Sequence, residues 1–136
     1  MSTGMEKGTQ FNVWSVDGIS ANALVPYLEQ SGDDNPLHRD PSVAASIGLP
    51  AIPVPGQLVM AIIERYLGAT APGNSIKRLT VKFVSPVFVD QSLDISGRVA
   101  AMREEGRSAV IRIRVLQEGR PTVLGEAEIN LNSPAE

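Results

Sequence analysis

The ten residues SGDDNPLHRD (31–40) bring an imidazole, three carboxylates and an amide together around one proline. His38 is the only histidine in the chain, and Asp33 lies five residues before it. Pro36 stiffens the turn between them, so the two side chains can converge on one small group. A carboxylate and an imidazole that share a water molecule can remove one of its protons and return a proton elsewhere. The pair therefore has the groups needed to hydrate a double bond, and Asn35 is placed to orient the water or its partners.

Other interpretations of these ten residues are simpler or are excluded. A lone histidine beside an Asp-Asn-Pro cluster is more often structural than catalytic, because such clusters form turns for backbone reasons alone. A calcium loop would need glycine where the chain has His38. With one histidine and no cysteine, neither a multi-histidine nor a cysteine zinc site can form within one chain. No pattern for a serine nucleophile is present, and we expect no metal ion and no other cofactor.

Two helices are expected around this motif. Ser20 can cap a helix over residues 21–30, in which Pro26 removes a backbone donor and should kink or weaken the helix. The segment PSVAASIG (41–48) has a proline suited to a first helical turn and a glycine suited to a helix end. The motif is therefore expected to lie in the connection between two short helices.

The strongest helical pattern follows in PGQLVMAIIERYLGAT (55–70). Its apolar residues recur at helical spacing and form one broad stripe: Leu58, Val59, Ile62, Ile63, Tyr66 and Leu67. Gln57 and Glu64 lie seven residues apart and share a second face. We expect the stripe to be buried and the second face to meet solvent, a pocket or another subunit.

The rest of the chain has the pattern of strands. Five segments are rich in β-forming residues or alternate between apolar and polar: 11–16, 79–83, 93–99, 111–115 and 123–131. One long helix with a run of antiparallel strands indicates an α+β domain in which a curved sheet wraps the helix. The sheet leaves an open edge, for which dimerisation is a common remedy. Arg112 and Arg114 are expected to face Glu126 and Glu128 across the last two strands.

Composition limits the class of protein. The net charge of −3 argues against a sequence-independent grip on nucleic acid. The absence of cysteine excludes disulfides and fits a reducing cytoplasm, where we expect a soluble protein. No stretch approaches the roughly 18 apolar residues of a membrane span. We expect a flexible N-terminus (1–10), a single domain (11–132) and a short C-terminal tail (133–136).

The segment SGDDNPLHRDPSVAASIGLP (31–50) is similar to the hydratase motif of the MaoC-like (R)-specific enoyl-CoA hydratases, a family with the hot-dog fold. Members show SGD, any residue, NPLH or NPIH, a further residue and aspartate. This chain supplies the matching residues in register: Ser31, Gly32, Asp33, Asn35, Pro36, Leu37, His38 and Asp40. The likeness continues through the long helix into SIKRLTVKFVSPVFVDQSL and covers roughly residues 15–132.

The resemblance implies a homodimeric hot-dog enzyme that reversibly adds water to a trans-2-enoyl thioester of coenzyme A or acyl carrier protein. The product is then the (R)-3-hydroxyacyl thioester. Asp33 and His38 become the catalytic pair, with Asn35 as a supporting residue. The resemblance also assigns the backbone N–H of Gly56 to the thioester oxygen, which agrees with the unpaired donors of a helix start.

Pro55 is the main departure from the family, because many relatives carry histidine before the glycine. Proline suits a first helical position, so the helix start should survive. The lost polar side chain affects the expected substrate range more than the reaction type. Gln57, Met60 and Glu64 are the expected substrate-contacting residues of the helix, and the two polar ones fit a substrate with extra polar groups.

Two alternative functions stay open. The hot-dog fold also hosts acyl-thioester hydrolases with a carboxylate on or near the central helix, and Glu64 is the candidate here. Exposure to solvent is the simpler interpretation of that glutamate. The second alternative is a noncatalytic acyl-binding subunit, against which the intact set of Asp33, Asn35, His38 and Gly56 argues.

Overall fold

The computed structural model describes residues 4–71 and 73–131. One antiparallel sheet has the strand order β1-β3-β4-β5-β2. Its strands are β1 (Trp14–Val16), β2 (Ser75–Phe83), β3 (Leu93–Arg103), β4 (Ser108–Gln117) and β5 (Arg120–Asn130). The helices are α1 (Ala21–Ser31), α2 (Pro41–Ser46) and α3 (Gly56–Thr70), with short 3₁₀ turns η1 (Pro36–His38) and η2 (Glu104–Gly106). Among the described residues, no helix is long and apolar enough to cross a membrane.

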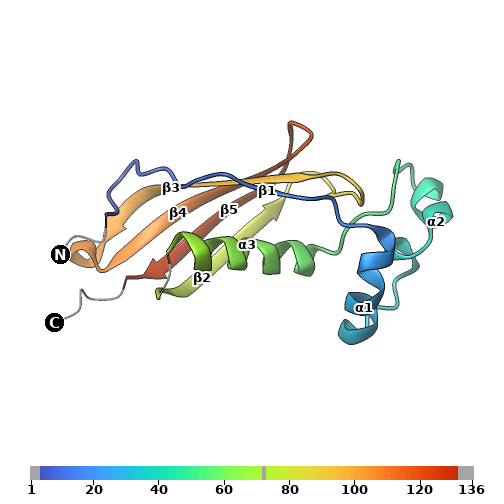
Figure 1. Cartoon of the computed structure of the whole chain (residues 1–136), viewed down its shortest axis with the longest axis horizontal. Helices are drawn as coiled ribbons and strands as arrows, with labels where there is room; N and C mark the ends of the chain where they lie inside the picture. Colours follow the sequence, from blue (N-terminus) through green and yellow to red (C-terminus); the bar gives the residue numbers. More distant parts are fainter. Residues whose placement is uncertain (1–3, 72, 132–136) are drawn as a thin grey trace.

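Helix α3 lies along one face of the sheet (Figure 1). Its inward stripe is buried or half-buried, as predicted: Leu58, Val59, Ile62, Ile63, Tyr66 and Leu67. Gln57 and Glu64 are both exposed, so the second face meets solvent in the single chain. The predicted α+β architecture, an antiparallel sheet packed on one long helix, is confirmed.

Tyr66 of α3 ties the N-terminal segment to the helix. Its hydroxyl donates to the carbonyl of Asn12 at 3.0 Å. Its ring meets Trp14 edge-on, with ring centroids 5.4 Å apart. Burial raises the pKa of the Tyr66 hydroxyl, because the charged form would lose its hydration.

The two short helices extend beyond the end of the sheet (Figure 1). Ser20 caps α1 as expected. The helix runs through Pro26 without a break. Helix α2 ends at Ser46 with Ile47 as its C-cap, and Gly48 follows with a φ of 85°, the left-handed conformation of a glycine that ends a helix, as predicted.

Strand positions agree with the predictions, with differences at the ends. The first strand covers only Trp14–Val16 instead of 11–16, although Gly8 and Phe11 also donate backbone hydrogen bonds to β3. The strands β2 to β5 are longer than their alternating cores. Residues 1–3 and the expected tail 133–136 lie outside the described residues, and the domain boundaries stay a prediction.

The charge pairing across β4 and β5 is only partly as expected. Arg112 stands opposite Glu126, but Arg114 stands opposite Leu124. Glu128 instead pairs with Lys77 of β2 at 3.5 Å. The register therefore places only Arg112 directly opposite a glutamate, and the positive charge beside Glu128 comes from Lys77 of β2.

Candidate active site

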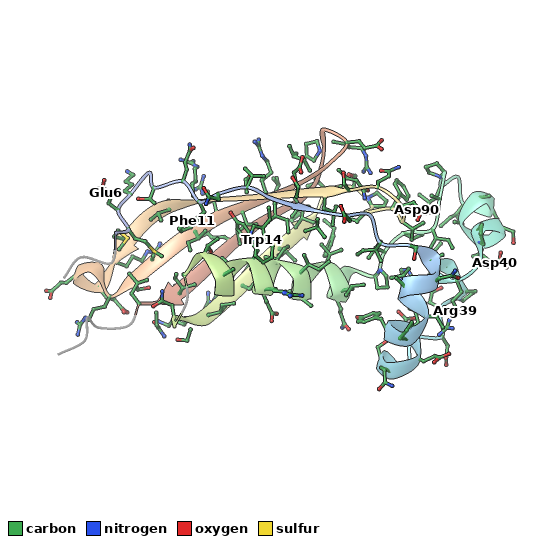
Figure 2. The ribbon with its side chains drawn as sticks, viewed as in Figure 1. Glu6, Phe11, Trp14, Arg39, Asp40 and Asp90 are labelled. Atoms are coloured by element: carbon green, nitrogen blue, oxygen red, sulfur yellow. The ribbon has the colours of Figure 1, made fainter. Side chains whose placement is uncertain are left out.

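The motif connects α1 to α2 at the end of the molecule where Figure 2 shows Arg39 and Asp40. Gly32 ends α1 with a φ of 71°, a left-handed conformation that glycine adopts without strain. Asp33 follows and is half-buried. Its carboxylate accepts a hydrogen bond from the N–H of Asn35 at 3.0 Å, which fixes the start of the turn.

Asn35 links Asp33 to His38 through its backbone. Its N–H donates to the Asp33 carboxylate, and its carbonyl accepts from the N–H of His38 at 3.2 Å. Its side-chain Oδ1 accepts from the N–H of Leu37 at 3.0 Å and caps η1. The Arg39 guanidinium donates to the carbonyl of Asp33 at 2.7 Å and closes the turn. Asn35 therefore shapes the turn, in agreement with the simpler structural interpretation of the Asp-Asn-Pro cluster.

The ring of His38 is held from one side. Its Nδ1 lies 2.7 Å from the carbonyl oxygen of Pro53. Because a carbonyl only accepts, Nδ1 carries the proton and Nε2 of the neutral ring keeps a lone pair. Within the described residues, no hydrogen bond joins the side chains of His38 and Asp33 directly. Within the same residues, neither Nε2 of His38 nor the second carboxylate oxygen of Asp33 has a hydrogen-bond partner.

The segment after Pro53 leads directly into α3. Pro55 is the N-cap of this helix, with φ −56° and ψ 135°, rather than its first helical residue. The helix start survives, as expected. Proline has no side-chain acceptor, and no side-chain hydrogen bond caps α3. In the described part of the chain, the N–H groups of Gly56 and Gln57 therefore have no acceptor, and such donors stabilise an oxyanion.

The caps of α1 and α2 show what α3 lacks. Ser20 accepts from the N–H of Ala23 at 3.1 Å. Asp40 accepts from the hydroxyl of Ser42 at 2.7 Å and from its N–H at 2.9 Å. These hydrogen bonds lower the pKa of Asp40, because they stabilise the carboxylate form. Of these three helices, only α3 lacks a side-chain cap, and α3 is the helix whose first residues are expected to bind substrate.

The expected substrate-contacting residues follow Gly56 along α3. A Cβ built on Gly56 would lie 3.1 Å from the Phe83 ring, so only glycine fits there without a shift. Gln57 is exposed and Met60 is half-buried. Glu64 lies eight residues beyond Gly56, about 12 Å along the helix axis. The helix therefore separates this carboxylate from the unpaired N–H groups.

A hollow of about 690 Å³ lies away from this motif, on the outer face of the sheet. Basic side chains contribute to its lining: Lys82, Arg98, Arg112 and Arg114. Outer faces of antiparallel sheets are commonly charged and solvated. The hollow therefore does not belong to the candidate site.

Comparison with known proteins identifies the family. A family model described as a MaoC-like domain matches residues 6–119. The chain belongs to the MaoC-like dehydratase family. This MaoC-like chain is 35% identical over 116 residues to an (R)-specific enoyl-CoA hydratase of Aeromonas caviae, covering 83% of the chain and 87% of the relative.

One further relative and one solved structure agree with this assignment. A mitochondrial 3-hydroxyacyl-[acyl-carrier-protein] dehydratase of Arabidopsis thaliana is 30% identical over 94 residues, covering 69% of the MaoC-like chain and 57% of the relative. The solved structure of an (R)-hydratase from A. caviae superposes with a TM-score of 0.84 at 29% identity, covering 95% and 98% of the two chains. The predicted hot-dog fold is thereby confirmed.

The sequence interpretation missed two parts of the site. It did not find Pro53 as the acceptor for His38, or Arg39 as the side chain that closes the turn. The arginine lies within the motif and could have been weighed as a donor to its backbone. The role of Pro53 could not be predicted from the sequence, because tertiary structure brings its carbonyl to a histidine 15 positions away.

Proposed function

We propose that this MaoC-like domain reversibly adds water to the double bond of a trans-2-enoyl thioester and forms the (R)-3-hydroxyacyl thioester. The carrier is coenzyme A or acyl carrier protein. The orientation of His38 supports the proposal most directly, because its bond to Pro53 leaves Nε2 free as a base. The relatives named as a hydratase and a dehydratase support the same chemistry in its two directions.

The reaction needs a base, an acid and a site for negative charge. In hydration, the water oxygen bonds to C3 of the acyl chain, and a proton is delivered to C2 on the same side. His38 and Asp33 hold the water, take its proton and supply the proton for C2. The N–H of Gly56 donates to the thioester oxygen, which carries the charge of the enolate formed between these steps. Asn35 and Arg39 keep the turn in shape.

Hydration and hydrolysis can be separated in one assay. The protein is given a trans-2-enoyl-CoA in the presence of a reagent that reports free thiol. We expect the absorbance of the conjugated double bond to fall while no thiol appears, and the product to be the (R) enantiomer. Rapid release of free coenzyme A with an intact double bond would instead support the thioesterase alternative.

Glu64→Gln tests that alternative at its candidate residue. A hydrolase would need Glu64 to aim water at a carbonyl held about 12 Å away along the helix axis, near Gly56. The glutamine variant keeps the size and polarity of the exposed side chain, so we expect it to consume the double bond at a rate close to the wild type. Thiol release that disappears in this variant would contradict the hydratase proposal.

We also propose that the protein is a homodimer joined at the open edge of the sheet. Strand β2 is an edge strand, and the adjoining apolar side chains Ile76, Phe83 and Val84 are 39%, 43% and 42% exposed. An edge strand with exposed apolar residues favours pairing with another chain. Light scattering at micromolar concentration should return twice the 14.5 kDa mass of one chain. A monomer mass would contradict the proposed homodimer.

The cytoplasmic location of the protein stays a prediction.

A further inference from the structure

Gln117 ends β4 and is fully buried although its side chain is polar. Its amide nitrogen donates to the carbonyls of Phe88 and Gln91, at 2.9 Å and 3.1 Å. Its amide oxygen accepts from the N–H of Phe88 at 2.8 Å and from the Arg120 guanidinium at 3.2 Å. The amide thus bonds both backbone groups of Phe88, as a neighbouring strand would.

The opposite edge of residues 87–89 pairs with residues 52–54. Two backbone hydrogen bonds join them: the N–H of Val54 to the carbonyl of Val87 at 2.6 Å, and the N–H of Val89 to the carbonyl of Ile52 at 3.0 Å. Pro53 stands opposite Phe88 between these bonds. Residues 87–89 are therefore hydrogen-bonded on both edges, to the Gln117 amide on one side and to residues 52–54 on the other.

Pro53 turns its carbonyl away from this pairing. In an antiparallel ladder, the residue between two bonded neighbours directs its backbone groups to the outer edge. Proline suits that position because no donor is needed there. The outward carbonyl is the group that accepts the Nδ1 proton of His38 at 2.7 Å. The position of this acceptor is therefore set by how residues 52–54 lie on residues 87–89.

We propose that Gln117 is a positioning residue for His38. Its amide binds the backbone of Phe88 and so fixes the position of residues 87–89, with which residues 52–54 pair. The carbonyl of Pro53 then stabilises the tautomer of His38 that carries its proton on Nδ1 and leaves Nε2 as a base. Gln117 acts through the protein and does not touch substrate. The effect on turnover rests on the proposed function, whereas the effect on the histidine ring does not.

The test uses Gln117→Met, which keeps the volume of the side chain and removes its polar groups. Thr122→Val is the matched control: Thr122 is also fully buried at this end of the sheet, and its hydroxyl donates to the carbonyl of Val115 at 3.0 Å. That hydrogen bond has no connection with residues 52–54. Both variants lose buried hydrogen bonding, but only the first loses the support of Pro53.

The readout is the pair of ring-nitrogen NMR signals of the neutral His38 ring, which need no assignment because the chain has one histidine. We expect wild type and Thr122→Val to show a protonated Nδ1 and an unprotonated Nε2. In Gln117→Met the two signals should move toward each other as both tautomers become populated. Turnover should fall about ten- to a hundredfold with little change in KM.

Unchanged ring signals in folded Gln117→Met would overturn the inference, whether or not the protein hydrates enoyl thioesters. Should this variant fail to fold, Gln117→Glu carries the test. Its carboxylate still accepts from Phe88 and Arg120 but cannot donate to the carbonyls of Phe88 and Gln91. We expect partial mixing of the tautomers, and a ring identical to the wild type would again overturn the inference.

Discussion

Replacing His38 with alanine should lower the rate of enoyl-thioester hydration by a factor of about 10² to 10⁴, the usual contribution of a general acid or base. The imidazole is oriented by Pro53, so its loss removes a positioned base and not only a side chain. Asp33→Asn should cause a loss of similar size, because the amide keeps the shape but cannot take up a proton. The two residues act on one water, so the double variant should lose much less than the product of the single losses. Steady-state kinetics on a short and a medium enoyl-CoA measure all three variants.

Asp34→Asn is the matched control for this series. Asp34 is adjacent to the proposed catalytic residue, carries the same charge and is exposed. Its variant should keep near wild-type turnover, since the change in net charge is the same but the proposed pair is intact. Near-normal turnover in folded His38→Ala or Asp33→Asn would contradict the assigned pair. An equal loss in Asp34→Asn would show that the local charge, and not the position of Asp33, is what matters.

The periodicity of the sequence was sufficient to predict the helices and strands that carry the fold. The stripe on α3 and the alternation in the last four strands each repeat over many residues, so one ambiguous residue does not change the assignment. The first strand was predicted too long because aromatic and β-branched residues in 11–16 favour a strand locally. Only Trp14–Val16 forms the strand. The segment before it pairs with β3 at Gly8 and Phe11, and the carbonyl of Asn12 accepts from Tyr66 of α3 instead.

Only those parts of the candidate site that lie close together in the sequence could be predicted from it. Asp33, Asn35 and His38 lie on one turn, so their proximity follows from their spacing and from Pro36. The partners that orient them come from elsewhere in the chain: Pro53 for the histidine ring, and Phe88 and Gln117 for the strand beneath Pro53. Such contacts depend on how residues 52–54 pair with residues 87–89, which no spacing in the sequence specifies.

Asn35 has a structural role in the turn that the sequence suggested only in general terms. The sequence interpretation considered its amide as a group that orients water. In the structure, its Oδ1 caps η1 and its backbone connects the Asp33 carboxylate to the N–H of His38. Asparagine is favoured at such caps because a short side chain reaches back to the backbone. The same property that makes it common in turns also holds the proposed catalytic pair together.

The unpaired N–H of Gly56 is expected to be as important as the acid-base pair, and it can be removed without removing the helix. Gly56→Pro eliminates this donor at the first helical position, where proline is well tolerated. Pro55 already has a ψ of 135°, the extended conformation that a following proline requires. Loss of one oxyanion donor should lower turnover by a factor of about 10² to 10³.

Gly56→Ala is the control, because it adds a similar Cβ but keeps the N–H. That Cβ would lie 3.1 Å from the Phe83 ring, which is 43% exposed and can shift by the few tenths of an ångström needed. We therefore expect a much smaller loss of turnover in the alanine variant, with both variants melting at similar temperatures. The ratio of turnover between alanine and proline at this position isolates the hydrogen bond from the steric change. Equal turnover in the two folded variants would show that the N–H of Gly56 does not stabilise the enolate. The enolate oxygen would then have to bind another donor, and the N–H of Gln57 is the next one to test.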